Sequence, residues 1–270
     1  MKKYISITVA IALTTLLAGC GVKFGIESRN NWWNNNVTTD DSSNKSESVN
    51  ISAEDITKIN KLDIKIDVSN VKINYYDGQN VEISGRLSKY SRGVRIEKKS
   101  DTLIIIEESK NNKNLTKDTS SNLTIDIPRS FKGNFELNFG VGQCEINDLE
   151  LKDVKIQNGV GELTLNEISF EKIDLNSGVG ETTLETSKKT GNINIKGGIG
   201  QTNISLGDIN GDLKFDGGMG STTIKVPENA PIKITSTAGL GEARIKAKTS
   251  NEGKYNFDIS VGVGEVEVTN

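Results

Sequence analysis

The chain has 270 residues, of which 34% are apolar, and its formal net charge is −3. This apolar share is low for a compact globule but fits a narrow β-solenoid, in which each coil buries only a few side chains. Histidine is absent, which excludes Ser-His-Asp and Cys-His nucleophiles and removes the commonest transition-metal ligand. No basic block interleaves with aromatic residues, so we expect no nucleic-acid partner.

Residues 1–20 have the pattern of an export signal. Lys2 and Lys3 precede an apolar segment, 5–17, that is too short to span a bilayer. It ends in Leu17-Ala18-Gly19-Cys20, which resembles the lipobox of bacterial lipoproteins. The resemblance implies cleavage before Cys20 and lipidation of Cys20, so that the mature protein is anchored on the extracytoplasmic face of the cell membrane. The alternative is an ordinary secretory signal with a chance cysteine.

Residues 21–50 are rich in Asn, Ser, Thr and Asp and show no apolar period, which predicts a disordered polar tether. Trp32-Trp33 lies within this segment. The pair is suited to contact with the membrane interface, where indole is favoured, but a plain linker or a hydrophobic hook that folds back on the domain is also open.

Residues 51–270 are expected to form one domain, which begins with irregular strands over 51–130. Alternating apolar residues such as Leu62/Ile64/Ile66/Val68 and Leu103/Ile105 indicate strands with one buried face. A polar loop follows at 110–122. We interpret this block as opening coils or a small sheet that closes one end of a repeat array.

Residues 131–270 carry the motif glycine–apolar–glycine seven times, at a period of about 20 residues that is typical of stacked supersecondary units. The copies begin at Gly140, Gly159, Gly178, Gly198, Gly218, Gly239 and Gly262. A phosphate-binding loop would need a helix after the glycines, and no helical period follows any copy.

Strand patterns flank each motif. Apolar residues lie three and five positions before the first glycine in six units, whereas the unit at Gly239 has Ser236 in that place. Another apolar residue lies four positions after every second glycine, from Ile146 to Val268. The two patterns differ in phase by one residue, so each second glycine is expected to mark a kink. The predicted fold is an all-β parallel β-solenoid of about seven Gly-x-Gly coils with an irregular N-terminal cap.

Three columns of equivalent residues follow from this register. The central residue of the motif, including Met219, is expected to face the core. Cys144 aligns with Leu163, Thr182, Thr202 and Thr222 and is expected to be a small core residue, with the threonines forming an internal hydroxyl ladder. The residue after each second glycine is expected to face solvent rather than hold Ca²⁺. This column is Gln143, Glu162, Glu181, Gln201, Ser221, Glu242 and Glu265.

From Leu123 onwards the chain resembles a known family. The segment Leu123-Thr124-Ile125-Asp126-Ile127-Pro128, followed by an alternating strand and the repeated glycine units, is similar to the DUF4097 family of bacterial envelope proteins, which are labelled as adhesins and are related to toast-rack domains. The resemblance covers about residues 56–270. It implies a single β-solenoid domain and no catalytic residues or cofactors.

The sequence therefore predicts a non-catalytic, membrane-anchored envelope lipoprotein that acts as an adhesin-like binding module. The strand faces before the motifs carry mixed charges and no aromatic platform, unlike solenoid enzymes that cleave polysaccharides. The partner is an envelope protein or polymer of unknown identity. A sensor or accessory domain in an envelope-stress pathway is the alternative. Self-association through the C-terminal coil is a further possibility, because Val266 and Val268 lie almost at the end of the sequence.

Overall fold

A computed structural model describes residues 47–110 and 120–270. The predicted signal, Cys20, Trp32-Trp33 and most of the predicted tether lie outside these residues. Within them all regular structure is β, apart from one turn of 3-10 helix at Ile56–Lys58. No helix in the described ranges is long and apolar enough to cross a membrane. The predicted all-β class is confirmed.

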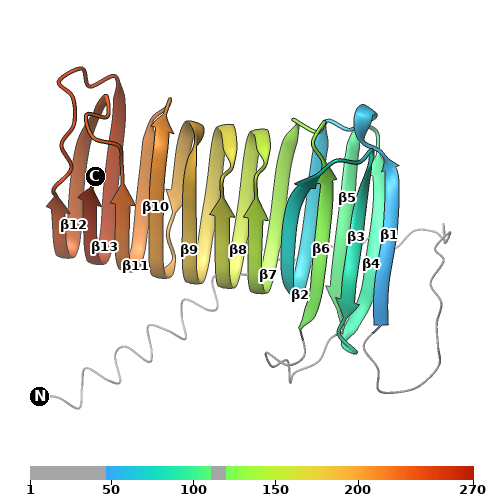
Figure 1. Cartoon of the computed structure of the whole chain (residues 1–270). Helices are drawn as coiled ribbons and strands as arrows, with labels where there is room; N and C mark the ends of the chain where they lie inside the picture. Colours follow the sequence, from blue (N-terminus) through green and yellow to red (C-terminus); the bar gives the residue numbers. More distant parts are fainter. Residues whose placement is uncertain (1–46, 111–119) are drawn as a thin grey trace, which may run out of the picture. The chain divides into compact units, whose positions relative to one another are not determined.

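Thirteen strands form one sheet, and most neighbouring strands are parallel (Figure 1). The order across the sheet is β1-β3-β6-β2-β7-β8-β9-β10-β11-β13-β12; off this path, β5 pairs with β2, and β4 pairs with β5. The strands are β1 (Glu47–Asp55), β2 (Lys61–Tyr76), β3 (Asn80–Leu87), β4 (Ser91–Lys99), β5 (Thr102–Ser109), β6 (Ser121–Pro128), β7 (Asn134–Asn147), β8 (Glu150–Asn166), β9 (Ser169–Lys196), β10 (Ile199–Ile209), β11 (Leu213–Lys225), β12 (Ile232–Ile245) and β13 (Tyr255–Thr269).

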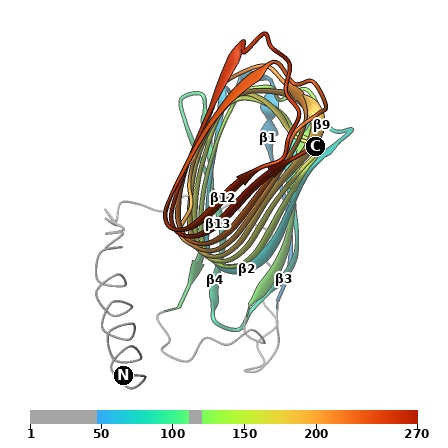
Figure 2. The ribbon, with the colours of Figure 1, turned by 90° about the vertical axis from the view of Figure 1, so that its left-hand side faces the viewer.

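Each regular coil consists of two strand arms joined by the Gly-x-Gly corner, and successive coils stack in register. Gly161 pairs with Gly142 on one side and with Gly180 on the other. Viewed along the stack, the coils superimpose as an oval outline (Figure 2). The predicted β-solenoid with parallel coils is confirmed, and its repeat is the one read from the glycines.

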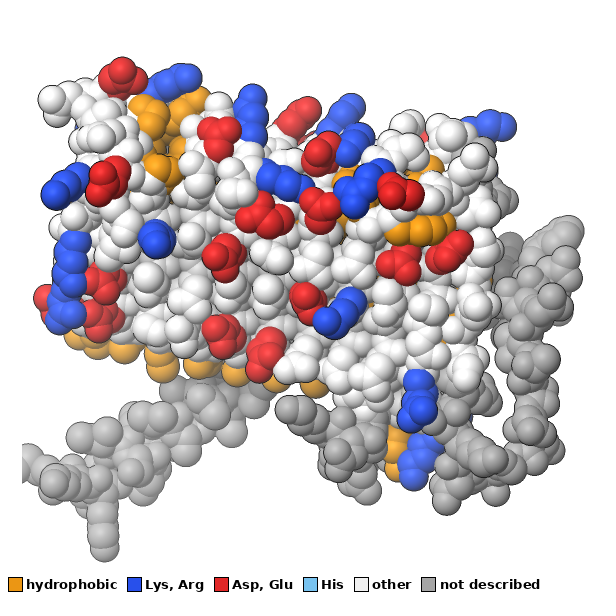
Figure 3. All heavy atoms as spheres, in the orientation of Figure 1, with side chains coloured by type: hydrophobic (Ala, Val, Ile, Leu, Met, Phe, Trp, Pro, Cys, Tyr) orange, Lys and Arg blue, Asp and Glu red, His pale blue; other side chains and the backbone are white. Residues whose placement is uncertain are grey.

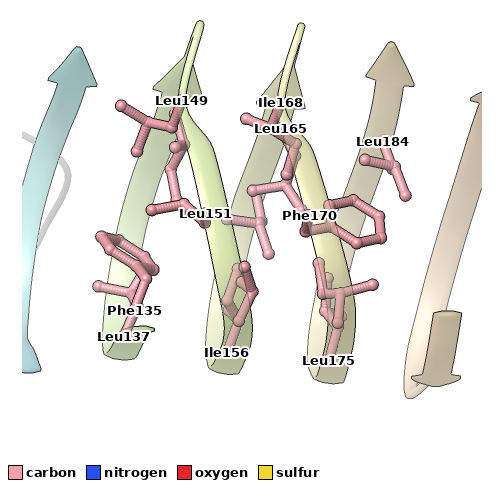
Figure 4. Close-up of a cluster of buried hydrophobic side chains, with 14 of the residues drawn as sticks. Phe135, Leu137, Leu149, Leu151, Ile156, Leu165, Ile168, Phe170, Leu175 and Leu184 are labelled. Atoms are coloured by element: carbon pink, nitrogen blue, oxygen red, sulfur yellow. The ribbon is translucent and has the colours of Figure 1, made fainter. Parts of the chain in front are cut away.

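The core lies between the two arms of every coil. The alternating residues before the corner, such as Phe135 and Leu137, and those after it, such as Leu165 and Leu184, belong to one buried cluster along the stack (Figure 4). Leu149 and Ile168, from the connections between strands, and Leu151 and Phe170, from the beginnings of β8 and β9, are also buried. Each fully buried aliphatic side chain contributes about 1.5–3 kcal/mol before the entropic cost of folding.

The N-terminal block contains a coil that the glycine pattern does not reveal. β2 pairs with β7 over its whole length, so that Asp67-Val68-Ser69 takes the position of Gly140-Val141-Gly142. On its other side, β2 pairs first with β5 and then with β6. β3, β1 and β4 then add antiparallel strands. The sheet begins at Glu47, inside the last four residues of the predicted tether.

The last two coils are exchanged in space relative to their order in the chain. β13 lies between β11 and β12, so β12 forms the end of the stack (Figure 2). Val266 and Val268 are fully buried. The expectation that these C-terminal residues form an open edge is therefore wrong. The physical reason is apolar content. β13 carries a full set of core residues, whereas β12 has Ser236 at a core position. Less apolar surface is therefore left uncovered when β12 is the strand at the end of the stack.

Candidate interaction surface at the glycine corners

The second glycine of each motif makes the predicted kink. All seven have φ between 132° and 143°, a range that side-chain-bearing residues rarely adopt. A Cβ added to Gly200 would also overlap the carbonyl oxygen of Gly180 in the preceding coil, and the other second glycines are placed in the same way. Both backbone angle and close stacking therefore require glycine at this position.

The first glycine is required by stacking alone. A Cβ at Gly159, Gly178, Gly198 or Gly218 would overlap the carbonyl oxygen of the preceding first glycine. The backbone N–H of Met219 donates to the carbonyl of Gly198 at 2.9 Å, which ties consecutive corners together. The paired glycines thus let the backbones approach closely, without intervening side chains, along the whole corner.

The central side chains of the motif point outward and form a line that we call the apolar ridge. Val141, Val160, Val179, Met219, Val263 and Leu240 expose 41–72% of their surface, and Ile199 between them is half-buried. Among the described residues, six of the seven exposed large apolar side chains belong to this ridge. Figure 3 shows it as a row of hydrophobic side chains along the lower edge, beneath β7 to β12.

The expectation that the central residues, including Met219, face the core is wrong. The inward phase ends one residue before the first glycine, at Phe139 and Asn158, both of which are buried. The next inward residue is the second after the closing glycine, such as Cys144. The chain therefore turns the corner over the three motif residues. Counting side chains as alternately inward and outward through this bend assigns the middle residue to the wrong side.

A polar column runs beside the ridge, on the side that follows the corner. It consists of the residue after each second glycine, which the sequence predicts to face solvent. Within this column the carboxylates Glu162 and Glu181 are neighbours in register, as are Glu242 and Glu265. Gln143 donates to Glu162 at 2.7 Å, Asn203 donates to Glu181 at 3.1 Å, and Arg244 bridges Glu242 and Glu265. Amide and guanidinium groups thus meet the carboxylates. In the described ranges, no group of three or more acidic, Cys or His residues is placed so that it could hold a metal ion.

The column of Cys144 faces inward, as predicted. Burial raises the pKa of the Cys144 thiol, so it stays a protonated core group. Thr182, Thr202 and Thr222 are buried in the same column, and Ser177 and Thr182 share a hydrogen bond of 2.7 Å. Beneath the corner the small residues leave a cavity of about 20 Å³, room for about one water molecule. Its lining includes Asn158, whose buried Oδ1 lacks a protein partner.

The outer face of the arms before the corners has a shallow open depression over β9, β11 and β13. Lys196, Lys214, Asp212 and Asp258 are among its lining residues, so both charge signs alternate there and no aromatic side chain contributes. This agrees with the sequence-based description of that face as mixed. The arrangement resembles ordinary solvated strand surface and supplies no nucleophile or general base in a defined position.

The corner of β2 is built from different groups, which the sequence analysis did not single out. Glu107 is 1% exposed; Ser91 donates to its Oε1 at 2.8 Å, and Ser121 donates at 3.4 Å. Its Oε2 is buried without a hydrogen-bond partner, and the nearby backbone of Val68 and Asp67 lowers the pKa of this carboxyl. Burial nevertheless dominates and raises the pKa of Glu107. The available signal was an acid that continues the inward alternation of Leu103 and Ile105.

These features define a β-solenoid with a glycine-lined corner and a surface ridge. The family model for the N-terminal domain of toast_rack, DUF2154, matches residues 37–185, more than half of the 270. The chain therefore belongs to the toast-rack family. This agrees with the relationship that the resemblance near Leu123 implied.

Three solved structures align with the chain at low identity. The first is a putative cell adhesion protein from Clostridium sporogenes, with 13% identity and a TM-score of 0.44, and the alignment covers 83% of this chain and 99% of that one. The second is a putative adhesin from Bacteroides fragilis, with 17% identity and a TM-score of 0.45, covering 83% of this chain and 97% of that one. The third is a putative adhesin from Parabacteroides distasonis, with 16% identity and a TM-score of 0.35, covering 83% of this chain and 97% of that one. No curated protein sequence matches the chain.

Proposed function

We propose that this protein is a non-catalytic lipoprotein of the cell envelope, anchored on the extracytoplasmic face of the membrane through Cys20, and that the apolar ridge is its binding surface. The observation that carries the proposal is the concentration of exposed large apolar side chains in one straight line. Contiguous exposed apolar surface on a soluble domain is typical of an interaction site.

Three further features support this function. The lipobox-like Leu17-Ala18-Gly19-Cys20 supports the anchor, and the polar segment that follows it supports display at a distance from the membrane. The sequence contains no histidine, which excludes Ser-His-Asp and Cys-His nucleophiles. The likeness of Leu123–Pro128 and the glycine units to the DUF4097 family supports an adhesin-like module.

The binding surface is tested with a variant that makes the middle of the ridge polar. Val160, Val179, Ile199 and Met219 are replaced together by threonine, which retains strand propensity. The matched control replaces the outward residues Thr164, Thr183, Asn203 and Thr223 on the same coils by alanine. Each full-length protein is crosslinked in intact cells and recovered, and its partners are identified by mass spectrometry.

We expect the control to capture the same partners as the natural protein and the ridge variant to lose them. Equal capture by both variants would refute the ridge as binding surface. Recovery of a membrane kinase or anti-sigma factor would favour the sensor function, and recovery of wall polymer would favour adhesion. Cys20→Ala tests the anchor separately, because it should release the protein from the membrane fraction.

A further inference from the structure

The ridge has a fixed period that restricts its partner. Its side chains come from strands in register, so they repeat at the strand spacing of about 4.8 Å over roughly 30 Å. A partner that contacts every one of them in the same way must present apolar groups at the same spacing. Another ridge of the same protein has this spacing by construction, as in the interdigitated sheets of steric zippers.

We propose that the ridge binds the ridge of a second copy of this chain, with the two stacks side by side and running in the same direction. The inference rests on the proposed function of the ridge and names its partner. The central side chains are mostly β-branched, and valine and isoleucine have few rotamers to lose, so ordering them in an interface costs little entropy.

The two flanks of the ridge have complementary chemistry. The flank after the corner contains four glutamates, namely Glu162, Glu181, Glu265 and Glu242. Arg244 pairs with Glu242 and Glu265, whereas Glu162 and Glu181 accept hydrogen bonds from amides. The flank before the corner contains the outward residues two positions ahead of each first glycine. Amides and one lysine dominate its first four coils, which contribute Asn138, Gln157, Asn176 and Lys196.

This asymmetry decides the relative direction of the two copies. If the two-fold axis runs along the ridges, the flank after the corner of one copy faces the flank before the corner of the other. Glu162 and Glu181 then face amide donors such as Gln157 and Asn176. If the axis is perpendicular to the ridges and passes through the middle coil at Ile199, each flank faces itself, and Glu162 of one copy meets Glu265 of the other. Like charges at short range oppose that arrangement.

The same column disfavours an anionic partner. The carboxylates of Glu162 and Glu181, whose partners are amides, repel an anionic lipid surface, whereas Arg244 offsets Glu242 and Glu265. The amide flank holds only one cation, Lys196, among its first four coils. An exposed line of this kind covers on the order of a few hundred Å², below the roughly 800 Å² per partner of a standard stable interface. The pair is therefore expected to form at the high local concentration of a tethered protein rather than in dilute solution.

The experiment uses disulfide crosslinking of the full-length protein in the cells that produce it. Three variants each carry one new cysteine on the ridge: Val160→Cys, Ile199→Cys and Met219→Cys. Thr223→Cys, exposed on the same coil as Met219 but away from the corner, is the matched control. The natural protein sets the background from Cys20 and the buried Cys144. Intact cells are treated with copper phenanthroline, and dimers are measured on non-reducing gels.

With parallel copies, each ridge cysteine faces its own counterpart within disulfide distance. We therefore expect all three ridge variants to form covalent dimers, several-fold above Thr223→Cys. Dimers for Ile199→Cys alone would indicate opposed copies and overturn the parallel arrangement. Dimer yields equal to the control for all three variants would overturn the second copy as partner. In that last case, loss of captured proteins by the threonine ridge variant would still support the ridge as a binding surface.

Discussion

The middle of the stack and its N-terminal end use the same coil but build its corner differently. In the middle, each second glycine has a positive φ and lies against the carbonyl of the preceding glycine. In β2, Val68 and Ser69 turn the same corner without a positive φ, and no glycine is present. There the neighbouring arms belong to two separate strands, β5 and β6, and the Glu107 carboxyl is buried beside the corner.

The difference indicates what the glycines are for. A bend alone does not need them, because β2 bends at the same position. They are needed where one corner stacks directly on another, since only a backbone without Cβ allows that approach. As a consequence, the side chain between the two glycines points outward and has no side chain next to it along the chain. These outward side chains together form the ridge.

The largest effect should come from a side chain placed in a stacked corner. Gly200→Ala combines an unfavourable φ with overlap against the Gly180 carbonyl, and we expect it to lower the free energy of unfolding by about 3 kcal/mol or more. Ser69→Ala at the β2 corner removes a buried hydroxyl that has no protein partner, so its effect should stay within about 1 kcal/mol. Urea unfolding measures both. Equal losses would contradict the distinction between the two corners.

The same core substitution should cost more stability in the middle of the stack than at the end formed by β12. Ile204 and Ile245 occupy the same column, but Ile204 is 2% exposed and Ile245 is 45% exposed. Ile204→Ala should therefore cost about 2–5 kcal/mol and Ile245→Ala less than about 1 kcal/mol. Unfolding midpoints in urea report the difference, and a costly Ile245→Ala would mean that β12 is covered.

The exchange of the last two coils makes a smaller but specific prediction. Val268 lies two residues from the end of the sequence yet is fully buried between β11 and β12. Val268→Ala should cost about 2 kcal/mol. The same urea unfolding assay is used. A loss below about 0.5 kcal/mol would place β13, not β12, at the edge and would restore the order of the chain.

Glu107 should give the smallest effect, and it depends on pH. Burial raises the pKa of its carboxyl in the folded protein, so the neutral form is favoured there. The stability linked to this group is therefore full below its ordinary pKa, near 4.5, and declines as the pH rises through the raised value.

The matching variant is Glu107→Gln, which stays neutral at every pH. The natural protein should gain stability relative to the variant when the pH falls from 7.5 to 5. The difference between the two proteins is used because it cancels the acid-induced losses at other carboxyls, such as Asp174, whose pKa is lowered by Lys172. A pH-independent difference would show that Glu107 does not titrate as described.

Much of the fold could be predicted because each stacked coil needs glycine and apolar residues at the same positions. The glycine period gave the coil length, and the apolar columns at Ile204 and Val268 gave the buried faces. The coil in β2 was hidden because its corner has no glycine. Ser236, at a core position of β12, was a sign of the exchange between β12 and β13. The order of the sequence itself gives no reason to expect the last coil between the two coils that precede it.

The outward direction of the ridge escaped prediction for a geometric reason. Alternation of side chains holds along an extended strand, but a residue with φ near 140° changes the direction in which its neighbours point. Met219 was therefore assigned to the core by counting, although the glycine beside it alters the count. The polar column was predicted correctly, because its residues lie beyond the bend.

One measurement tests most directly whether the glycine corners exist to hold an exposed ridge. The free energy of unfolding is determined in urea for the natural protein and for the variant with threonine at Val160, Val179, Ile199 and Met219. If these side chains lie on the surface, the four changes together should alter the stability by less than about 2 kcal/mol. If they were core residues, the combined loss should be several times that of a single core truncation, or the variant should not fold.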